Sequence, residues 1–409
     1  MILKNNIPQG YKQTELGIIP EDWQLQSVGK HCSVKARIGW QGLRSDEYLT
    51  SGEYGLITST DIVDGMVDWG TCCFVSKARY SQDPNIIVQE NDTLISKDGT
   101  IGKVGIVQNI PFPSTLNSGI FVVRPKLDNV YKNYLAFAFK SIYFQDFINR
   151  LTAGSTIVHL YQKDIVKFVF PVPPIAEQRA IAEALSDVDG LIAALDKKIA
   201  KKRLLKQGAM QQLLTGKKRL PGFTDKWVEK KLGEICSIIM GQSPSSEYYN
   251  TQNRGLPLIQ GNADLENRQQ VVRFYTSQIT KECEKGDVIF SVRAPVGAVG
   301  KATHKSCLGR GVCAIKTDND FLYHYLVYIE NDWSSFSKGS TFDSINSDEL
   351  CQLSLVLPQT KKEQQAIATI LSDMDKEIAD LEAQRDKYRL LKSGMMQKLL
   401  TGQIRLKTE

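Results

Sequence analysis

The sequence has few of the residues that metal sites and nucleophilic active sites require. Its 409 residues include only four histidines, and its eight cysteines are scattered, with none in a CxxC pair. Zinc sites need clustered thiolates or imidazoles. We therefore predict no metal site, and we interpret the cysteines as free thiols of a reducing compartment.

Signals for membranes and for secretion are missing as well. The sequence contains no run of 18 apolar residues that would form a membrane span. Its first 17 residues, MILKNNIPQGYKQTELG, have no apolar core of the kind found in signal peptides. We therefore expect a cytoplasmic protein.

Motifs for cofactor chemistry are absent too. The segment GTIGKVG (99–105) spaces its glycines three apart and does not match a dinucleotide fingerprint. The segment TGKK (215–218) lacks the upstream glycine of a phosphate loop, and no Asn-Pro-Pro-Tyr-like run suggests an amino-methyltransferase site. We predict that the chain itself is not an enzyme and binds no cofactor.

What the sequence does contain is a long helical pattern at 173–216. It opens with PVPP, continues with apolar residues at alternating steps of four and three, and ends at Gly216. These steps predict a heptad seam, and the flanking prolines and glycine are typical of helix ends. Some 40 residues at ~1.5 Å each span ~60 Å, which favours a spacer or a coiled-coil arm. The seam comprises Ile181, Leu185, Val188, Ile192, Leu195 and Ile199.

The same helical pattern occurs twice in the chain. Residues 363–406 match 177–220 after a shift of about 186 positions, with roughly 26 of 44 residues identical, which indicates an internal repeat of half the chain. We expect the two apolar seams to bury against each other. The second seam comprises Ile367, Leu371, Met374, Ile378 and Leu381.

A strand-rich segment precedes each long helix, and the two segments share landmarks in the same order. Each has a tryptophan after a turn, Trp23 and Trp227, and then short apolar strands ending in polar turns. Each has a strand–loop–strand pattern, ENDTLISKDGTIGKVGIV (90–107) and EKGDVIFSVRAPVGAVGKA (284–302), and later a GST segment. The loops SKDGT (96–100) and SVRAP (291–295) differ in chemistry, as two binding sites of different specificity would. Their glycines also fit plain hairpin turns, which is the structural alternative.

Positive charge concentrates on the first long helix. The chain has a formal net charge of +6, and residues 173–219 carry about +5 of it. This charge fits either a solvated helix face or a stripe that contacts phosphates. The basic residues are Lys197, Lys198, Lys201, Lys202, Arg203, Lys206, Lys217, Lys218 and Arg219.

The doubled pattern PxP…EQRAIAxxLSDxDxxI…KxRLLKxGxMQxLLTGxxRL, together with the loops DGTIGKVG and VRAPVG and the two GST segments, resembles the specificity subunits of type I restriction–modification systems. The resemblance covers the whole chain. It implies an α+β fold with two similar strand-rich recognition domains and two long antiparallel coiled-coil helices in a pseudo-twofold repeat. The implied parts are recognition domains at 1–172 and 217–358 and long helices at 173–216 and 359–409.

The resemblance also implies partners. Each domain would recognise one half of a bipartite, asymmetric target in double-stranded DNA, and the helices would set the gap and dock two methyltransferase subunits. Restriction subunits would complete the complex, and S-adenosylmethionine, ATP and Mg would bind to these partner subunits.

We select candidate residues from the divergent loops, the basic stripe and the repeated leucines. The DNA-binding candidates are Ser96, Lys97, Asp98, Thr100, Lys103, Ser155, Thr156, Gln260, Asn262, Ser291, Arg293, Ser340, Thr341, Lys201 and Lys202. The subunit-docking candidates are Leu204, Leu205, Leu213, Leu214, Leu390, Leu391, Leu399 and Leu400. Leucines at helical spacing are often core residues, so an intramolecular role for each stays open.

Two other classes of function fit parts of this pattern. An adaptor would use the helices to join two modules that do not bind DNA, and a self-sufficient enzyme would need an active site that the motifs above do not provide. A specific DNA-binding protein loses affinity steeply as salt rises, which separates it from an adaptor. The target sequence itself depends on a few side chains at groove edges and does not follow from spacing.

Overall fold

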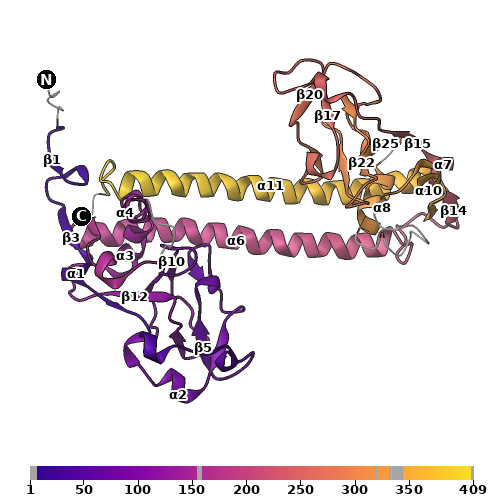
Figure 1. The fold of residues 1–409 in the computed structure, drawn as a ribbon. Coiled ribbons are helices and arrows are strands. Elements are labelled where there is room, and N and C mark those ends of the chain that lie inside the picture. The colour runs from indigo at the N-terminus through magenta and orange to yellow at the C-terminus, as the bar shows by residue number, and fades with distance from the viewer. Residues whose placement is uncertain (1–6, 154–158, 319, 331–332, 334–343, 407–409) are drawn as a thin grey trace. The chain divides into compact units, whose positions relative to one another are not determined.

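The computed structural model describes residues 7–153, 159–318, 320–330, 333 and 344–406 (Figure 1). The chain forms two compact units, Met1–Ala194 with Arg385–Glu409 and Leu195–Gln384. The long helices α6 (Ile175–Leu213) and α11 (Lys361–Leu399) are each shared between the units, α6 being divided after Ala194 and α11 after Gln384.

The first unit is built on a six-stranded sheet of order β4-β12-β9-β10-β7-β6, beside a three-stranded sheet of order β11-β5-β8. The pairs β1-β2 and β13-β3 complete its strands. The strands are β1 (Tyr11–Thr14), β2 (Gly17–Pro20), β3 (Gln24–Ser27), β4 (Cys32–Lys35), β5 (Tyr54–Ile57), β6 (Ile62–Val63), β7 (Met66–Val67), β8 (Cys73–Val75), β9 (Thr93–Ser96), β10 (Val104–Ile106), β11 (Ser114–Leu116), β12 (Ile120–Pro125) and β13 (Val169–Val172).

The second unit repeats the six-stranded sheet and the two-stranded pair before the long helix, but its second sheet has five strands instead of three. Its six-stranded sheet has the order β15-β25-β22-β23-β19-β18, its second sheet has the order β16-β20-β17-β24-β21, and β14 pairs with β26. The strands are β14 (Val228–Lys231), β15 (Ser237–Met240), β16 (Tyr249–Asn250), β17 (Leu256–Ile259), β18 (Leu265–Glu266), β19 (Gln269–Gln270), β20 (Phe274–Thr276), β21 (Glu282–Cys283), β22 (Val288–Ser291), β23 (Val299–Lys301), β24 (Ser306–Leu308), β25 (Val312–Lys316) and β26 (Ser354–Leu357).

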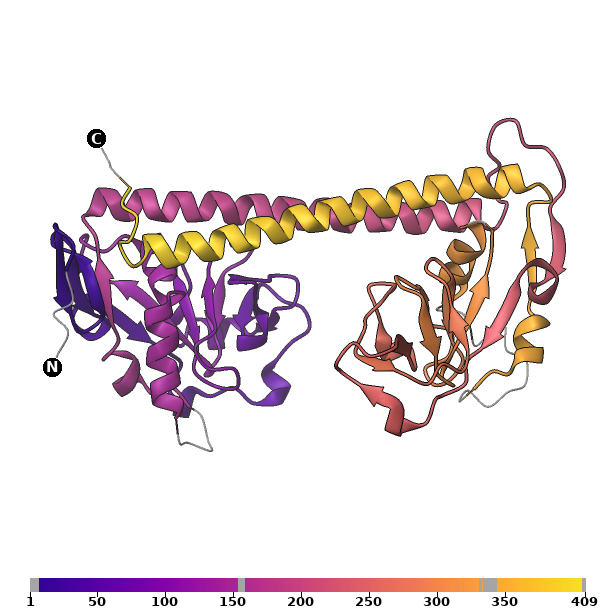
Figure 2. The same ribbon diagram turned by 90° about the horizontal axis from the view of Figure 1, so that it is seen from above.

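Short helices flank these sheets; several are labelled in Figure 1, and Figure 2 shows the same ribbon from above. Helices α3 and α8 precede the strand that leads into each long helix, and both are almost wholly buried. None of the helices within the described residues is long and apolar enough to cross a membrane. The short helices are α1 (Val28–His31), α2 (Lys77–Tyr80), α3 (Lys132–Phe139), α4 (Ile142–Thr152), α5 (Gln162–Ile165), α7 (Leu232–Ile235), α8 (Phe321–Ile329) and α10 (Ser347–Cys351).

The apolar seams of the long helices are buried, as predicted. Ile181 and Leu185 lie in the core of the first unit together with Leu399 and Leu400. In the second unit Ile367 and Leu371 share a core with Met210, Leu213 and Leu214, and a separate cluster joins Leu195 and Ile199 to Ile378 and Leu381. Within each unit α6 and α11 therefore pack side by side through their seams, and the predicted α+β internal repeat is confirmed. The domain boundaries at 172, 216 and 358 stay a prediction.

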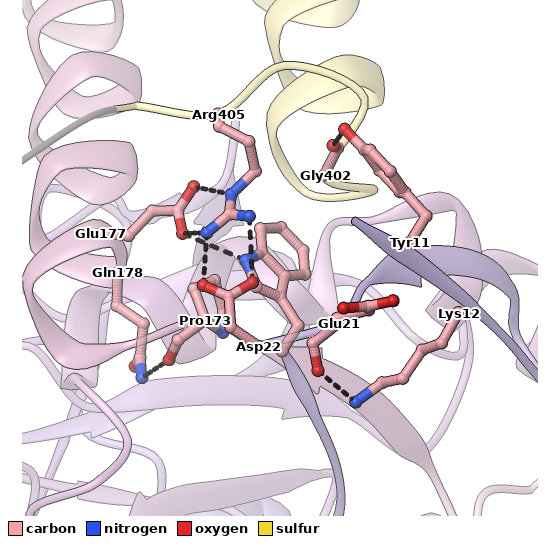
Figure 3. A network of polar contacts seen from close by, with 10 residues as sticks. Tyr11, Lys12, Glu21, Asp22, Pro173, Glu177, Gln178, Gly402 and Arg405 are labelled. Carbon is pink, nitrogen blue, oxygen red and sulfur yellow. Dashed lines mark hydrogen bonds and ion pairs between the residues drawn. The ribbon is translucent and has the colours of Figure 1, made fainter. Parts of the chain in front are cut away.

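A polar clamp holds the start of α6 in the first unit (Figure 3). The Arg405 guanidinium donates to both oxygens of Glu177, at 2.7 and 2.8 Å, and to both oxygens of Asp22, at 2.9 and 2.7 Å. Trp23 Nε1 also donates to Glu177, at 3.0 Å, and the guanidinium lies over the Trp23 ring. The hydrogen bonds from Arg405 lower the pKa of Asp22, and both carboxylates raise the pKa of Arg405.

The second unit has the same clamp one repeat along the chain. Arg219 donates to both oxygens of Glu363, at 2.7 and 2.8 Å, and lies over the ring of Trp227. Trp227 Nε1 lies 3.4 Å from Glu363. Each long helix thus begins with a buried glutamate that binds an arginine from just beyond the end of the other helix. The predicted landmarks Trp23 and Trp227 belong to these clamps.

Candidate nucleic-acid interface

The loop between β9 and β10 is held by a compact set of hydrogen bonds. The Ser96 hydroxyl donates to the Thr100 carbonyl and accepts from Lys103 N at 2.9 Å, while Ser96 N donates to Lys103 O at 2.9 Å. Gly102, at φ +75°, donates its N–H to Ser96 O at 3.0 Å. The serine side chain is therefore fully buried and closes the loop from within.

The loop between β22 and β23 has the same framework. The Ser291 hydroxyl donates to Pro295 O at 2.7 Å and accepts from Ala298 N at 2.9 Å, and Ser291 N donates to Ala298 O at 2.9 Å. Gly297, at φ +99°, donates its N–H to Ser291 O at 3.0 Å. The two loops have equal length and equal anchors, so their residues correspond one to one.

These anchors correct two of the predicted DNA contacts. Ser96 and Ser291 are buried and use their hydroxyls inside the loops, so we now assign them to holding the loop rather than to contacting DNA. A polar residue in a loop looks available in the sequence because the sequence does not show which way it points.

Lys97 and Asp98 follow the anchor in the first unit. Gly119 O accepts from Lys97 N, and Lys97 O accepts from Leu160 N, both at 2.9 Å. The Lys97 ammonium lies 5.4 Å from the centre of the Phe121 ring, so its side chain packs inward. Asp98 instead makes an ion-pair contact with His159 Nδ1.

The other polar residues of this loop differ in exposure. Thr100 is exposed at the loop tip, and its carbonyl accepts the Ser96 bond. Lys103 is half-buried and donates from Nζ to Ser59 O at 3.3 Å.

Arg293 is exposed in the second loop, as are Ala294 and Pro295. It lines a hollow of about 440 Å³ together with Arg310, Asn346 and Glu349. Its neighbour Val292 is buried and holds the same two backbone bonds as Lys97, to Gly311 O and from Ile345 N. The position of Arg293 therefore corresponds to Asp98, not to Lys97.

Gln260 and Asn262 lie on the turn after β17. Gln260 is exposed and its backbone N–H donates to the buried Asp264 carboxylate at 2.7 Å; Asn262 is half-buried. The corresponding turn in the first unit has the same device, with Thr58 N bound to Asp61 at 2.7 Å. The candidates Ser155, Thr156, Ser340 and Thr341 lie outside the described residues.

A few cations of the basic stripe of α6 pair with carboxylates of α11, whereas most residues of the stripe are exposed. Lys202 pairs with Glu377 at 2.6 Å, Arg203 with Glu382, and Lys206 with Asp375. Lys202 is therefore held by a carboxylate of the same unit, whereas Lys201 is exposed. Part of the stripe thus binds the second helix, and the exposed remainder is consistent with a solvated helix face or with phosphate contacts.

The repeated leucines divide into two sets. Leu213, Leu214, Leu399 and Leu400 are at most 6% exposed and belong to the cores of their units, so the prediction that they dock a partner is corrected. Leu204 and Leu390 are 69% and 75% exposed, and the adjacent Leu205 and Leu391 are about half exposed. The two exposed leucine pairs recur at the same place in the two repeats.

The described residues contain no group of three histidine, cysteine or acidic side chains that would hold a metal. Burial raises the pKa of the Cys32, Cys72 and Cys236 thiols to about 12. These cysteines therefore remain protonated and unreactive at neutral pH.

Three exposed or half-buried residues near the loops escaped the sequence analysis. His159 contacts Asp98, the Tyr161 ring lies 4.6 Å from the His159 ring, and Arg310 shares the hollow of Arg293. Tyr161 is 54% exposed, which is unusual for an aromatic side chain beside a polar cluster. The sequence separates these residues from the loops that they contact, so no local motif marks them.

Comparison with known proteins gives consistent matches. The family model for the type I restriction modification DNA specificity domain matches residues 20–202 and again residues 224–388. The chain is 30% identical to a protein assigned as the MjaX type I restriction enzyme specificity subunit of Methanocaldococcus jannaschii, over 98% of both chains. It is 26% identical to the MjaVIII specificity subunit of the same organism, over 95% of this chain and 94% of that one.

A solved structure shares the fold. The S subunit of a type I restriction–modification system from M. genitalium superposes with a TM-score of 0.66 at 16% identity, covering 98% of both chains. This likeness extends to both repeats and both long helices of the chain.

Proposed function

We propose that this chain, which belongs to the family of type I restriction–modification specificity subunits, recognises a bipartite DNA sequence, with one recognition domain on each half. The observation that supports the proposal most directly is the pair of loops after Ser96 and Ser291. Their hydrogen-bond frameworks match, whereas their exposed tips carry different charges. One scaffold used twice with different tips suits two half-sites of different sequence.

The chain contributes recognition and assembly, and the chemistry belongs to its partners. In this proposal two methyltransferase subunits supply adenine methylation with S-adenosylmethionine, and restriction subunits supply ATP- and Mg-dependent cleavage. The long helices fix the gap between the half-sites. A cytoplasmic location follows from this role.

The experiment is to co-express the chain with its methyltransferase partner and to sequence the methylated sites on plasmid DNA. We expect one bipartite motif with an unspecified gap. Binding to that motif should weaken steeply as salt rises, because phosphate contacts release counterions. Methylation without a fixed motif, or a complex whose DNA affinity ignores salt, would overturn the proposal and favour an adaptor.

The exposed leucines are the proposed docking surface for the methyltransferase subunits. Leu204 with Leu205, and Leu390 with Leu391, recur at the same place in the two repeats, so we expect two equivalent docking sites and a 2:1 partner ratio. Replacing both leucines of one pair by glutamate places charges in an apolar contact, which costs affinity strongly.

Native mass measurement tests this surface. The Leu204→Glu/Leu205→Glu variant should bind one partner subunit instead of two, and the variant with both pairs changed should bind none. Leu191→Glu is the matched control, because Leu191 is an exposed leucine of α6 outside the repeat pair. Retention of two partners by the fourfold variant would show that the partners dock elsewhere.

A further inference from the structure

Asp98 and Arg293 occupy the same position in two copies of one loop. Each lies two residues after the anchoring serine and directly after a residue held by backbone bonds on both sides. The residue before Asp98 is bonded to Gly119 and Leu160, and the residue before Arg293 is bonded to Gly311 and Ile345, all at 2.9 Å. The position is therefore fixed by the backbone of each unit rather than by its side chain.

The Asp98 carboxylate is both accessible and oriented. Its side chain is 45% exposed, and one oxygen contacts His159 Nδ1. The other oxygen lies near Gly119, 3.6 Å from where a Cβ would stand there. The His159 ring is itself placed against Tyr161. This arrangement holds the carboxylate at one angle while it still faces solvent.

Arg293 presents the opposite chemistry. It is exposed, and its hollow also contains the Arg310 side chain. The backbone position that corresponds to His159 is Ser344, which forms a β-bridge with Arg293. Two guanidiniums at one hollow make a site that attracts hydrogen-bond acceptors.

A carboxylate only accepts hydrogen bonds and a guanidinium only donates them. In the DNA major groove the exocyclic amines of cytosine and adenine are donors, and guanine offers the acceptors O6 and N7. Acidic side chains accordingly accept from cytosine N4, and arginine binds guanine with two bonds.

The geometry points to a single base-recognition position in each loop. Asp98, oriented by His159, accepts a hydrogen bond from a base amine, with cytosine preferred, in the half-site of the first unit. Arg293 donates to a guanine in the half-site of the second unit. This inference rests on the proposed DNA recognition and names the side chain that distinguishes bases in each half.

The test is selection from a randomised DNA library by the reconstituted complex with its methyltransferase partner. Asp98→Ala should lose roughly 10- to 100-fold discrimination at one base pair of one half-site. Asp98→Asn should shift that preference toward adenine, since an amide both donates and accepts. Arg293→Ala should lose discrimination at a guanine in the other half-site and nowhere else.

Asp128→Asn is the matched control, because it also removes an exposed carboxylate. Asp128 follows the end of β12 that lies away from the loop, whereas the start of β12 pairs with Ser96. It should leave the base preferences in both half-sites unchanged.

His159 is a positioning residue. His159→Ala should weaken the base preference at the same base pair as Asp98→Ala does, and the double variant should show no further loss. His159→Gln, which keeps a donor, should retain most of the preference. A residue that only stabilised the loop would weaken binding to all sequences alike.

The outcomes separate this inference from the proposed function. A wild-type complex without any preferred sequence would overturn both. A specific wild-type complex whose preferences survive Asp98→Ala and Arg293→Ala would overturn the inference alone. The inference would also be wrong if Asp98→Ala and Arg293→Ala changed the base preference in the same half-site, or if they weakened binding to all sequences equally.

Discussion

The two glutamate–arginine–tryptophan clamps are copies of one device, yet they are not equal. Arg405 binds two carboxylates, Glu177 and Asp22, whereas among the described residues Arg219 binds one, Glu363. Trp23 is fully buried and bonds at 3.0 Å, and its counterpart Trp227 is half-buried and lies 3.4 Å away. The extra carboxylate lies in the PEDW turn before Trp23, which has no copy in the second unit. Asp22 thus gives the first clamp two hydrogen bonds in addition to those that Arg405 makes to Glu177.

The largest expected effect comes from removing the arginines. Arg405→Ala leaves Glu177, 3% exposed, as a buried carboxylate with only the Trp23 N–H, which costs about 3–5 kcal/mol. Arg219→Ala should cost about 1 kcal/mol less, because no second carboxylate loses its partner. Hydrogen exchange at β3 and β13 reports the first unit, and exchange at β14 and β26 reports the second. Equal losses in the two units would show that Asp22 adds nothing.

A second difference lies in the response to acid. His324 is buried in the second unit, with Nε2 2.9 Å from Ser372 Oγ, and the first unit has no buried histidine among its described residues. The pKa of His324 is lowered to about 4, mainly by burial and in part by Lys206 and Lys301, while Asp375 and Asp320 oppose this shift.

Because the unfolded chain binds this proton near pH 6.5 and the folded unit does not, stability is present above pH 6.5 and falls as the pH drops toward 4. The loss amounts to about 3 kcal/mol in the second unit. His324→Gln should flatten this dependence, and His31→Gln in the first unit should not. Hydrogen exchange at pH 7 and pH 5 measures the free energy of unfolding of each unit. If the His324→Gln variant lost as much stability between these pH values as the wild type, the prediction would be wrong.

The smallest expected effect concerns ion pairs between the long helices. Lys392 pairs with Asp189 in the first unit and is 17% exposed, whereas Lys202 pairs with Glu377 in the second and is 30% exposed. Solvent screens the more exposed pair, so Lys202→Ala should cost at most about 0.5 kcal/mol and Lys392→Ala about 1 kcal/mol. Thermal unfolding at low and high salt checks this order. If Lys202→Ala left stability unchanged but strongly weakened DNA binding, Lys202 would be a DNA contact rather than a residue that only pairs the helices.

The sequence predicts the repeat and the seam because both depend on spacing along one chain. The heptad steps correctly mark Ile181, Leu185, Ile367 and Leu371 as buried. Spacing does not separate Leu204 from Leu213, since both fit a helical stripe. The difference is tertiary: the strands and short helices of the second unit cover Leu213 and leave Leu204 exposed.

The loops show the same limit at the candidate site. The sequence identifies the polar loops, but Ser96 and Ser291 turn inward because their hydroxyls close the turn. His159 reaches Asp98 because Leu160 N bonds to Lys97 O across 63 residues of chain. Such a contact is set by a long-range backbone hydrogen bond between two loops, which leaves no trace in local composition.

The closed framework of the two loops has a consequence for how such proteins diversify. Each loop is tied by backbone atoms and one inward serine, so residues 98 and 293 are free to vary without loosening any of these bonds. Most substitutions elsewhere in a protein carry a cost in stability that limits which are tolerated. At these two positions that limit is relaxed. Under the proposed base recognition, single mutations there would change the target sequence while the scaffold stays the same.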